Sequence, residues 1–295
     1  MSSLTRRKFL VAAGAATLGA LALFEDGFVR EPNQPQLVPI EMPLRRLPAA
    51  FDGFRIALLS DFHYDEFFSI HPIRRAVEMV NGIVPDLVVL TGDFVTVSML
   101  VDFVHDEKKS ALAAEPCAKL LAPLRSRLGS MATLGNHDID ADPDYVTEAL
   151  QSQGIAVLRN ASRTIEQAGK RLWICGLDST EGKPRIELGL QAVPRNEPVI
   201  LLMHEPDFAD VAKDYPVDLQ LSGHSHGGQV WIPGLGAPWL PGGARKYPRG
   251  RYTVGRLPLY TNIGLGTIRA PVRLNCTPEV TLVTLRAGEP IRTTS

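Results

Sequence analysis

Five short clusters of metal-binding side chains constrain this sequence more than any other feature. Each cluster follows directly on an apolar run rich in Val, Ile and Leu, which is typical of a buried β-strand. The chain has seven histidines, and most of them lie in these clusters. In chain order the clusters are Asp61-Phe62-His63, Gly92-Asp93, Gly135-Asn136-His137-Asp138, His204 and Gly223-His224-Ser225-His226-Gly227-Gly228.

The order of apolar and amphipathic segments predicts the fold class. Apolar residues recur at helical spacing in Ile70–Ile83 and Cys117–Leu128, and Asp142 is a good N-cap for a helix that begins at Pro143 and is closed by Gly154. Strands and helices alternate in the first half and strands dominate the second, which favours layered α/β with two sheets. The predicted strands are Phe54–Leu59, Leu87–Thr91, Met131–Leu134, Leu172–Gly176, Val199–Met203, Leu219–Ser222, Leu259–Ile263 and Val280–Leu285.

The position of each cluster after a strand predicts that the clusters converge. Ligands of α/β sheets bind beyond the carboxyl ends of the strands, and Asp-x-His at a strand end places both side chains on one face. Carboxylate, imidazole and amide donors form a ligand set that suits Mn²⁺, Fe²⁺ or Zn²⁺. Because Cys is absent from the clusters, a purely structural zinc site is disfavoured. The sequence therefore predicts a metal site that uses several strand ends.

Composition excludes some functional classes. The formal net charge is -1, so no overall field favours nucleic acid, and no nucleic-acid surface is recognisable. A hydrophobic fraction of 45% is ordinary for a globular enzyme. The three widely spaced cysteines, Cys117, Cys175 and Cys276, leave two readings open: one disulfide, or three buried thiols.

Residues 1–28 have the layout of an export signal or anchor. Basic residues precede an apolar run from Phe9 to Phe24 of about 16 residues. That run is shorter than the roughly 20 residues that a spanning helix needs. The segment Thr5-Arg6-Arg7-Lys8-Phe9-Leu10 resembles a twin-arginine signal, which implies the twin-arginine export machinery as a partner.

Two fates of this segment remain open. Ala20-Leu21-Ala22 offers a cleavage site, and the alternative is an uncleaved anchor with membrane association. In both cases the folded domain is expected outside the cytoplasm, at the periplasmic or extracellular face. Residues 29–53 are Pro-rich and predict a linker with one edge strand at Gln36–Met42. The catalytic domain is expected over residues 54–288, with exposed loops at Val95–Glu115 and Pro233–Arg251.

The five clusters, in this order, resemble the calcineurin-like metallophosphoesterases over residues 54–286. The turn Gly223–Gln229 and the later Gly264-Leu265-Gly266 are similar to those of the exported or membrane-associated bacterial branch. The resemblance implies an α/β fold built as a four-layer α/β/β/α sandwich of two mixed β-sheets, with two divalent metal ions (Mn, Fe or Zn) between strand ends.

The resemblance also implies a role for each residue. The first ion would be held by Asp61, His63 and His226, the second by Asn136, His204 and His224, and both by Asp93. His137 would be a catalytic residue that does not bind metal, and Asp138 would orient it. The implied reaction is hydrolysis of a phosphodiester, or a phosphomonoester, by a hydroxide that the two metals activate.

Several alternatives stay open at this stage. The substrate would be a phospholipid headgroup, a cell-envelope phosphodiester or a nucleotide. A second enzymatic reading is a pyrophosphatase acting on a UDP-acyl-sugar precursor of lipid A, and a third is a non-catalytic binding module on the same fold. Arg269 and Arg273 either contact a substrate phosphate or are solvated surface residues. Trp231 and Trp239 either form an apolar wall for a lipid-like substrate or serve ordinary packing.

Overall fold

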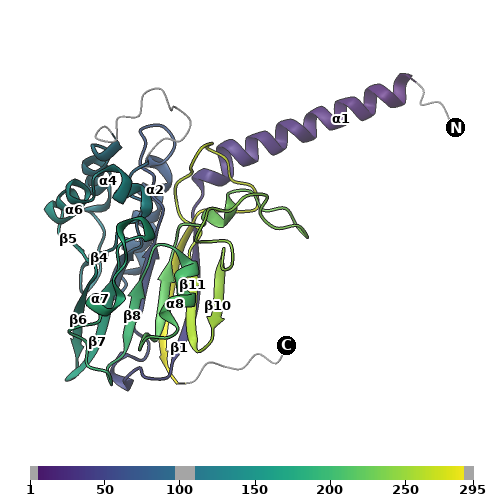
Figure 1. The fold of residues 1–295 in the computed structure, drawn as a ribbon. Coiled ribbons are helices and arrows are strands. Elements are labelled where there is room, and N and C mark those ends of the chain that lie inside the picture. The colour runs from purple at the N-terminus through teal and green to yellow at the C-terminus, as the bar shows by residue number, and fades with distance from the viewer. Residues whose placement is uncertain (1–5, 97–109, 289–295) are drawn as a thin grey trace.

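The structure is a computed structural model that describes residues 6–96 and 110–288. Its centre is a pair of six-stranded sheets that face each other, as Figure 1 shows. The predicted loop Val95–Glu115 falls mostly on residues 97–109 and so lies largely outside the described residues, and its last two residues already belong to a helix.

The first sheet holds three of the strands that precede the predicted clusters. From one edge to the other its strands are β1 (Gln36–Leu44), β12 (Glu279–Ala287), β2 (Arg55–Leu59), β3 (Leu87–Leu90), β4 (Ser130–Ala132) and β5 (Ile155–Val157). β2 to β5 are parallel, and β12 runs antiparallel to β2. The carboxyl ends of β2, β3 and β4 therefore lie at one edge of this sheet.

The second sheet holds the other two such strands. Its order is β10 (Gly250–Val254), β11 (Leu257–Thr261), β9 (Leu219–Ser222), β8 (Val199–Leu202), β7 (Lys170–Gly176) and β6 (Ala161–Gln167). β11, β9, β8 and β7 are parallel, while β10 and β6 are antiparallel edge strands. Both sheets are mixed, as predicted.

Helices cover the outer faces of both sheets. An apolar core between the sheets includes Ile56 and Leu58 of β2 and Ile200 and Leu202 of β8. The alternate residues of the same strands face outward, because side chains in a strand alternate between its faces. They pack against helices α2 (Ile70–Ile83), α4 (Ala114–Leu121) and α6 (Pro143–Ser152) on one side and short α7 (Ile186–Gly189) and α8 (Ala209–Ala212) on the other. The predicted four-layer α/β/β/α sandwich is confirmed.

Of two predicted helices, one has other ends than expected and one begins as predicted. The helix expected at Cys117–Leu128 is α4, which begins at Ala114 and ends at Leu121. Pro123 lacks an N–H and its ring conflicts with the carbonyl four residues earlier, so the helix stops before it. By contrast α6 begins at Pro143 as expected, and the Asp142 carboxylate accepts a hydrogen bond from the Tyr145 N–H.

The Pro-rich segment 29–53 is part of the folded body. Its predicted edge strand extends to Leu44 as β1, which pairs with β12 over its whole length. Leu47 and Phe51 that follow are buried in the core between the sheets. Two of the prolines, Pro39 and Pro43, lie on this edge strand, where a missing N–H costs no ladder hydrogen bond.

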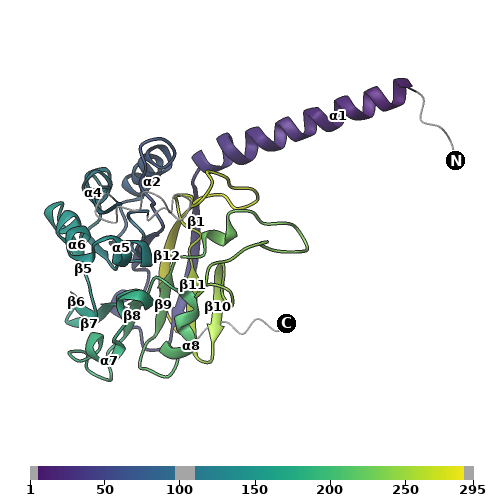
Figure 2. The same cartoon turned by 45° about the horizontal axis from the view of Figure 1, so that its top comes forward.

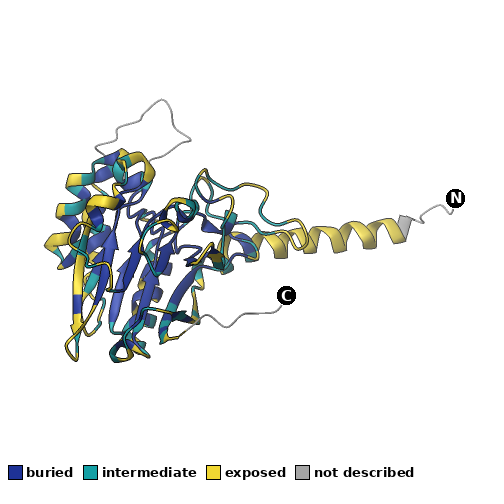
Figure 3. Cartoon of the chain, turned by 60° about the horizontal axis from the view of Figure 1, so that its bottom comes forward, coloured by how far each residue is buried: buried dark blue, intermediate teal, exposed yellow. Residues whose placement is uncertain are grey.

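The N-terminal segment is a long exposed helix. α1 (Arg6–Glu25) continues through a π-helical turn (Asp26–Arg30) and a 3₁₀ turn (Glu31–Asn33). Lys8–Asn33 form 26 helical residues whose most apolar window has a mean hydropathy of 1.5, long and apolar enough to cross a membrane by length and composition. The apolar run alone had suggested a segment too short to span. Figure 3 shows α1 projecting away from the body of the protein.

Candidate metal centre

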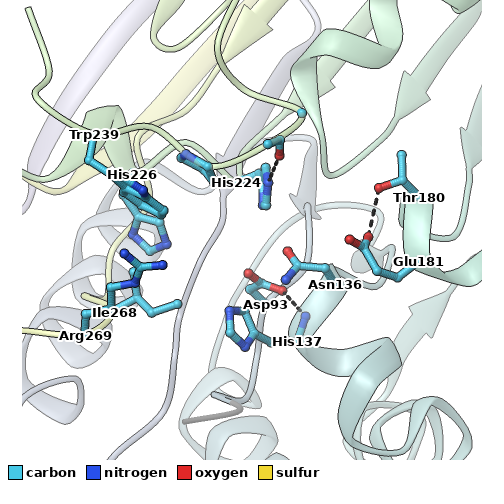
Figure 4. Close-up of a pocket in the computed structure, with 13 residues that line it drawn as sticks. Asp93, Asn136, His137, Thr180, Glu181, His224, His226, Trp239, Ile268 and Arg269 are labelled. Atoms are coloured by element: carbon cyan, nitrogen blue, oxygen red, sulfur yellow. Dashed lines mark hydrogen bonds between the residues drawn. The ribbon is translucent and has the colours of Figure 1, made fainter. Parts of the chain in front are cut away.

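The five predicted clusters meet at the edge where the parallel strands of both sheets end. Asp61 and His63 follow β2, Asp93 follows β3, and Asn136 and His137 begin α5 (Asn136–Ala141) after β4. His204 follows β8, and His224 and His226 follow β9. Figure 4 shows several of these side chains turned toward one cavity. Residues more than 160 positions apart are thus in contact, as between His63 and His226.

One group of donors consists of Asp61, His63 and His226, whose ligand atoms lie within 4.8 Å of one another. The Nε2 atoms of His63 and His226 are 3.0 Å apart, and His226 Nε2 is 3.4 Å from an Asp61 carboxylate oxygen. All three side chains are buried. These are the residues that the family resemblance implies for the first metal, apart from the shared Asp93.

A second group consists of Asp93, His204 and His224, with ligand atoms again within 4.8 Å. His204 Nε2 lies 3.1 Å from Asp93 Oδ2 and 3.1 Å from His224 Nδ1. Asp93 Oδ2 is also 3.4 Å from Nε2 of His63, in the first group. A single carboxylate oxygen therefore lies between the two groups, where a bridging ligand is expected.

In two of the imidazoles, those of His204 and His224, one nitrogen is hydrogen-bonded to a backbone carbonyl and the other faces the centre. His204 Nδ1 is 2.6 Å from the Thr91 carbonyl oxygen, and His224 Nε2 is 2.7 Å from that of Gly242. Because a carbonyl accepts, each of these nitrogens donates, and the other nitrogen keeps its lone pair. Metal-binding histidines are commonly held in this way by an outer hydrogen bond.

The Asn136 side chain provides a further test of whether the residues fit a cation. Its Oδ1 is buried and has no hydrogen-bond partner within the described residues. A buried oxygen without a donor costs about 1–3 kcal/mol, and a metal ion would satisfy it. Together with the donor groups, this oxygen makes a set of carboxylate, imidazole and amide ligands that suits two divalent ions.

Electrostatics at the site also favour positive charge. Burial lowers the pKa of His63 and of His226 to about 3, so both rings stay neutral at neutral pH. Burial alone would raise the pKa of Asp93, but the nearby His204 and His137 outweigh it and hold the pKa well below its usual range. Burial likewise opposes protonation of His204, yet Asp93 raises its pKa well above normal. The carboxylates that favour a proton on His204 would favour a metal cation at the same place.

The backbone around the centre is held in an uncommon conformation. Asp61, His63, Asp93, His224 and His226 all have φ between 41° and 68°. Non-glycine residues rarely occupy this left-handed region, and such strain concentrates at functional sites. These left-handed residues follow the strands β2, β3 and β9 directly.

Glycine leaves the space that these turns need. A Cβ on Gly135 would lie 2.1 Å from Asp93 Oδ1, and one on Gly223 would lie 2.5 Å from Asp61 Oδ2. Both distances are far below van der Waals contact. The glycines of the two conspicuous motifs thus allow the loops from different strands to approach the carboxylates closely.

We expect Gly135→Ala to lose metal affinity, because its methyl group would push the Asp93 carboxylate out of place. Metal affinity should fall at least about 10–100-fold, the typical cost of disturbing a group that supports a ligand. Metal titration followed by calorimetry measures the change. Gly82→Ala is the control: Gly82 lies in α2 with no atom within 4 Å of the added Cβ. Equal affinities in the two variants would contradict this role.

Asp138 holds the loops of the centre together. Its carboxylate accepts hydrogen bonds from the backbone N–H groups of Asp93 (2.8 Å), Phe94 (2.8 Å), Val95 (3.2 Å) and Gly135 (2.9 Å). It therefore ties the loop after β3 to the loop after β4. In addition, the His137 N–H donates to Asp93 Oδ1 at 3.0 Å. These hydrogen bonds hold the backbone that carries both Asp93 and His137.

The centre opens into a cavity of about 520 Å³. Asp93, Asn136 and His137 line its floor, and Figure 4 shows two further walls. On one side lie Thr180 and Glu181, which no sequence motif had indicated. On the other lie Trp239, Ile268 and Arg269, with the Arg269 guanidinium 4.1 Å from the Trp239 ring centroid.

Of the four candidate residues outside the clusters, one tryptophan and one arginine line the cavity, and the other two do not. Trp239 and Arg269 line the cavity, whereas the Trp231 ring is covered by the Arg249 guanidinium, 4.4 Å from its centroid. Arg273 is fully buried, so both expectations for it, phosphate contact and solvated surface, are wrong. Its guanidinium donates to the carbonyl oxygens of four residues: Cys276, Ile263, Gly264 and Gly266.

Replacing Arg273 should mainly affect stability. We expect Arg273→Met to lower the free energy of unfolding by at least about 3 kcal/mol, since each buried carbonyl left without a donor costs roughly 1–3 kcal/mol. Urea unfolding measures it. As a control, Arg269→Met should cost less than about 1 kcal/mol, the usual worth of an exposed cation–π contact. If Arg273→Met lowered the free energy of unfolding as little as the control does, the structural role of Arg273 would be refuted.

The structure decides between the two interpretations of the cysteines and confirms the predicted loop after β9. Cys117, Cys175 and Cys276 are free and buried, which decides for three thiols over a disulfide. The predicted loop Pro233–Arg251 carries no helix or strand until β10 begins at Gly250. This loop contributes Trp239, Gly242 and Gly243 to the cavity.

Comparison with known proteins points to one family. The family model of the calcineurin-like phosphoesterases matches residues 54–228. The uncharacterized metallophosphoesterase YkuE of Bacillus subtilis is 34% identical over 97% of this chain and 99% of its own length. Phosphodiesterase YaeI of Escherichia coli is 32% identical, over 96% and 99%. The UDP-2,3-diacylglucosamine pyrophosphatase LpxG of Chlamydia muridarum is 24% identical, over 86% and 90%.

Proposed function

This chain belongs to the calcineurin-like phosphoesterase family, and on that premise we propose that it hydrolyses phosphodiesters outside the cytoplasm with a pair of divalent metal ions. Membership of a family of metal-dependent hydrolases makes it an enzyme and removes the binding-module alternative. The observation that carries the two-ion proposal is the position of Asp93, whose Oδ2 lies 3.4 Å from His63 Nε2 and 3.1 Å from His204 Nε2.

The ligand sets follow from the two donor groups. We assign Asp61, His63 and His226 to one ion. The other ion would be held by His204, His224 and the otherwise unpartnered Oδ1 of Asn136. Asp93 would serve both ions. When bound, such ions provide a nucleophile at neutral pH, since a cation lowers the pKa of water from 15.7 to about 7, and they offset the charge of the phosphoryl group.

The residues around the ions position the substrate and move a proton. His137 lines the cavity beside the first donor group, with its ring centroid 5.0 Å from that of His63. From there it protonates the leaving oxygen of the ester, a general-acid role. Asp138 keeps the loop under His137 in place through its backbone hydrogen bonds. Arg269, at the opposite wall, offers its guanidinium to a phosphate oxygen.

A diester is preferred over a monoester for two reasons. The cavity has walls on both sides of the metal-binding floor, so both arms of a diester find contacts. In addition, a relative that spans nearly the whole chain is a phosphodiesterase. The second candidate, a pyrophosphatase acting on a UDP-linked acyl sugar, is favoured by the likeness to LpxG. Its substrate would be met in the cytoplasm, so export of this chain would exclude it.

Export is supported by the N-terminal helix. Lys8–Asn33 are helical and apolar enough to act as a signal or an anchor, and Arg6-Arg7 precede the apolar run as in a twin-arginine signal. A pathway that exports folded chains would let the cytoplasm load the ions first. A fusion of β-lactamase after residue 295 would report the location, since that reporter can fold before export and protects the cell from ampicillin only outside the cytoplasm.

The proposed activity is tested with two chromogenic esters. The full chain in detergent is stripped of metal, restored with Mn²⁺, Zn²⁺ or Fe²⁺, and assayed on bis-p-nitrophenyl phosphate and p-nitrophenyl phosphate. We expect hydrolysis only after restoration and faster hydrolysis of the diester. Faster hydrolysis of the monoester would reverse the preference, and cleavage of UDP-diacylglucosamine alone would establish the pyrophosphatase instead.

A further inference from the structure

We propose that the face around the mouth of the cavity rests on a lipid bilayer and that the enzyme acts on phosphodiesters whose apolar part remains in that bilayer. The substrate half of this inference rests on the proposed phosphodiesterase activity, whereas the docking of the face does not. Four features support it: an unpartnered apolar helix, a rigid connection from that helix to the site, an exposed aromatic rim, and an amphipathic cavity.

The first feature is the exposed apolar surface of α1. Side chains such as Phe9, Leu18 and Leu21 are 59% to 70% exposed, and none of the most apolar window is buried against the described part of the chain. Apolar surface on this scale is unfavourable in water. A bilayer is the partner that fits a single apolar helix of this length.

The second feature is a rigid connection between this helix and the metal centre. Just after α1, the Gly27 carbonyl accepts a hydrogen bond from the Arg273 N–H at 2.9 Å. The Glu31 carboxylate accepts from the N–H groups of Asn275 and Cys276 and from the Thr277 hydroxyl. The end of the helix is therefore fastened to the loop that follows Gly264.

That loop reaches the ligand Asp61 directly. The buried Arg273 guanidinium holds the carbonyls of Gly264 and Gly266. Gly266 in turn donates its N–H to the Asp61 carbonyl at 2.7 Å, and a Cβ on Gly264 would lie only 2.6 Å from the Asp61 Cβ. A membrane-held helix would thus fix the orientation of the metal centre relative to the bilayer.

The third feature is a rim of exposed apolar side chains on the α1 side of the site. Phe28, at the base of the helix, lines a small hollow together with Phe68, and the Phe67 ring lies 6.4 Å from that of Phe68. Phe67 is 84% exposed. Leu235 is 83% exposed in the loop between β9 and β10, which extends to the same side as α1 in Figures 1 and 2.

The fourth feature is the division of the cavity into a polar floor and an apolar wall. Asp93, Asn136 and His137 form the floor, whereas Trp239 and Ile268 line the wall that belongs to the rim loops. Arg269 stands over Trp239, where it pairs a positive charge with an aromatic surface. An amphiphile fits this division, with its phosphate on the floor and its apolar part leaving past Trp239 toward the bilayer.

The chemistry for such a substrate is ordinary hydrolysis. The oxygen of one water molecule bonds to phosphorus, one P–O ester bond breaks, and the leaving oxygen takes a proton. The acyl part of the substrate stays in the bilayer throughout. The enzyme therefore has no need to extract a lipid from the membrane, which would expose its chains to water at about 0.8 kcal/mol for each CH₂.

Docking itself is tested without any catalysis. The full chain is reconstituted in phosphatidylcholine vesicles whose acyl chains carry bromine, which quenches nearby tryptophan. We expect quenching in the native chain and a clear loss of it in Trp239→Phe. Trp173, buried in the core and hydrogen-bonded to Glu197, should contribute none. Equal quenching with and without Trp239 would overturn the docking of this face.

The substrate class is tested with two diesters that share the p-nitrophenolate leaving group: soluble bis-p-nitrophenyl phosphate, and phosphatidyl-p-nitrophenol embedded in phosphatidylcholine vesicles. The rim variant combines Phe67→Ser with Leu235→Ser, neither of which lines the cavity. We expect the vesicle substrate to be hydrolysed roughly tenfold more slowly by this variant, since two apolar anchors are removed, and the soluble one at the native rate.

A matched control carries Leu188→Ser with Val211→Ser on α7 and α8, which are exposed apolar residues on the side of the body away from α1. It should hydrolyse both esters at the native rate. If the rim variant also hydrolysed both at the native rate, the membrane-substrate inference would fail. If Trp239 were quenched but neither ester were hydrolysed by the native chain, docking would stand and the proposed phosphodiesterase function would fall.

Discussion

Asp93→Asn is expected to lose both metal ions and hydrolysis together. The Asp93 carboxylate lies between the two donor groups, and the adjacent His204 and His137 hold its pKa well below the usual range, so it is fully charged at neutral pH. An amide at this position keeps the shape and removes the charge that both ions share. The hydrolysis rate should fall by more than about 10²-fold, beyond the 10–100-fold typical for losing an outer partner of a ligand.

The number of metal ions per chain is measured by inductively coupled plasma mass spectrometry. The rate of hydrolysis of bis-p-nitrophenyl phosphate is measured on the same samples. Asp218→Asn is a suitable control. Its carboxylate is nearly buried and binds Arg46, but it stands at the amino end of β9, opposite the metal centre. That variant should keep both ions. Full occupancy in Asp93→Asn would show that this carboxylate does not bridge.

His137→Ala is expected to keep both ions and lose turnover. His137 lines the cavity floor and belongs to neither of the two assigned ligand sets, so its loss should leave the ions in place. General-acid help to a leaving group is typically worth about 10²–10⁴ in rate. We therefore expect kcat to fall by about that factor with unchanged metal content.

A leaving-group series separates this role from a merely structural one. A good leaving group such as p-nitrophenolate needs little protonation, whereas phenolate needs more. The rate loss in His137→Ala should therefore be larger for diphenyl phosphate than for bis-p-nitrophenyl phosphate. Equal losses would argue against proton donation. Loss of an ion in this variant would place His137 among the metal ligands. The structure allows this alternative, because ligand atoms of His137, His63 and Asp93 lie within 4.8 Å of one another.

The sequence was enough to predict that the clusters converge, because each cluster follows the carboxyl end of a strand. Parallel strands bring their carboxyl ends to one edge, so the order of apolar runs and polar clusters was enough to bring His63 and His226 together. The strand Leu219–Ser222 and the helix Ile70–Ile83 match the structure residue for residue. These segments have strong periodicity and clear flanking signals, which is where sequence patterns are most informative.

Other features depend on tertiary contacts, which a short stretch of sequence does not reveal. Arg273 has the sequence environment of a surface arginine, yet it is buried and its guanidinium donates to carbonyl groups of Cys276 and of the turn 263–266. Glu181 lines the cavity only because the chain after β7 folds back over α5. The left-handed turns at Asp61 and His224 carry no glycine at those positions that would signal them. These features depend on how the chain folds back on itself, which a short sequence pattern does not show.

Anomalous X-ray scattering from crystals grown with Mn²⁺ would show directly whether two ions share Asp93. We predict two peaks about 3.5–4 Å apart. One should be bounded by Asp61, His63 and His226, the other by Asn136, His204 and His224, with Asp93 touching both. A single peak, or two peaks away from these side chains, would contradict the account.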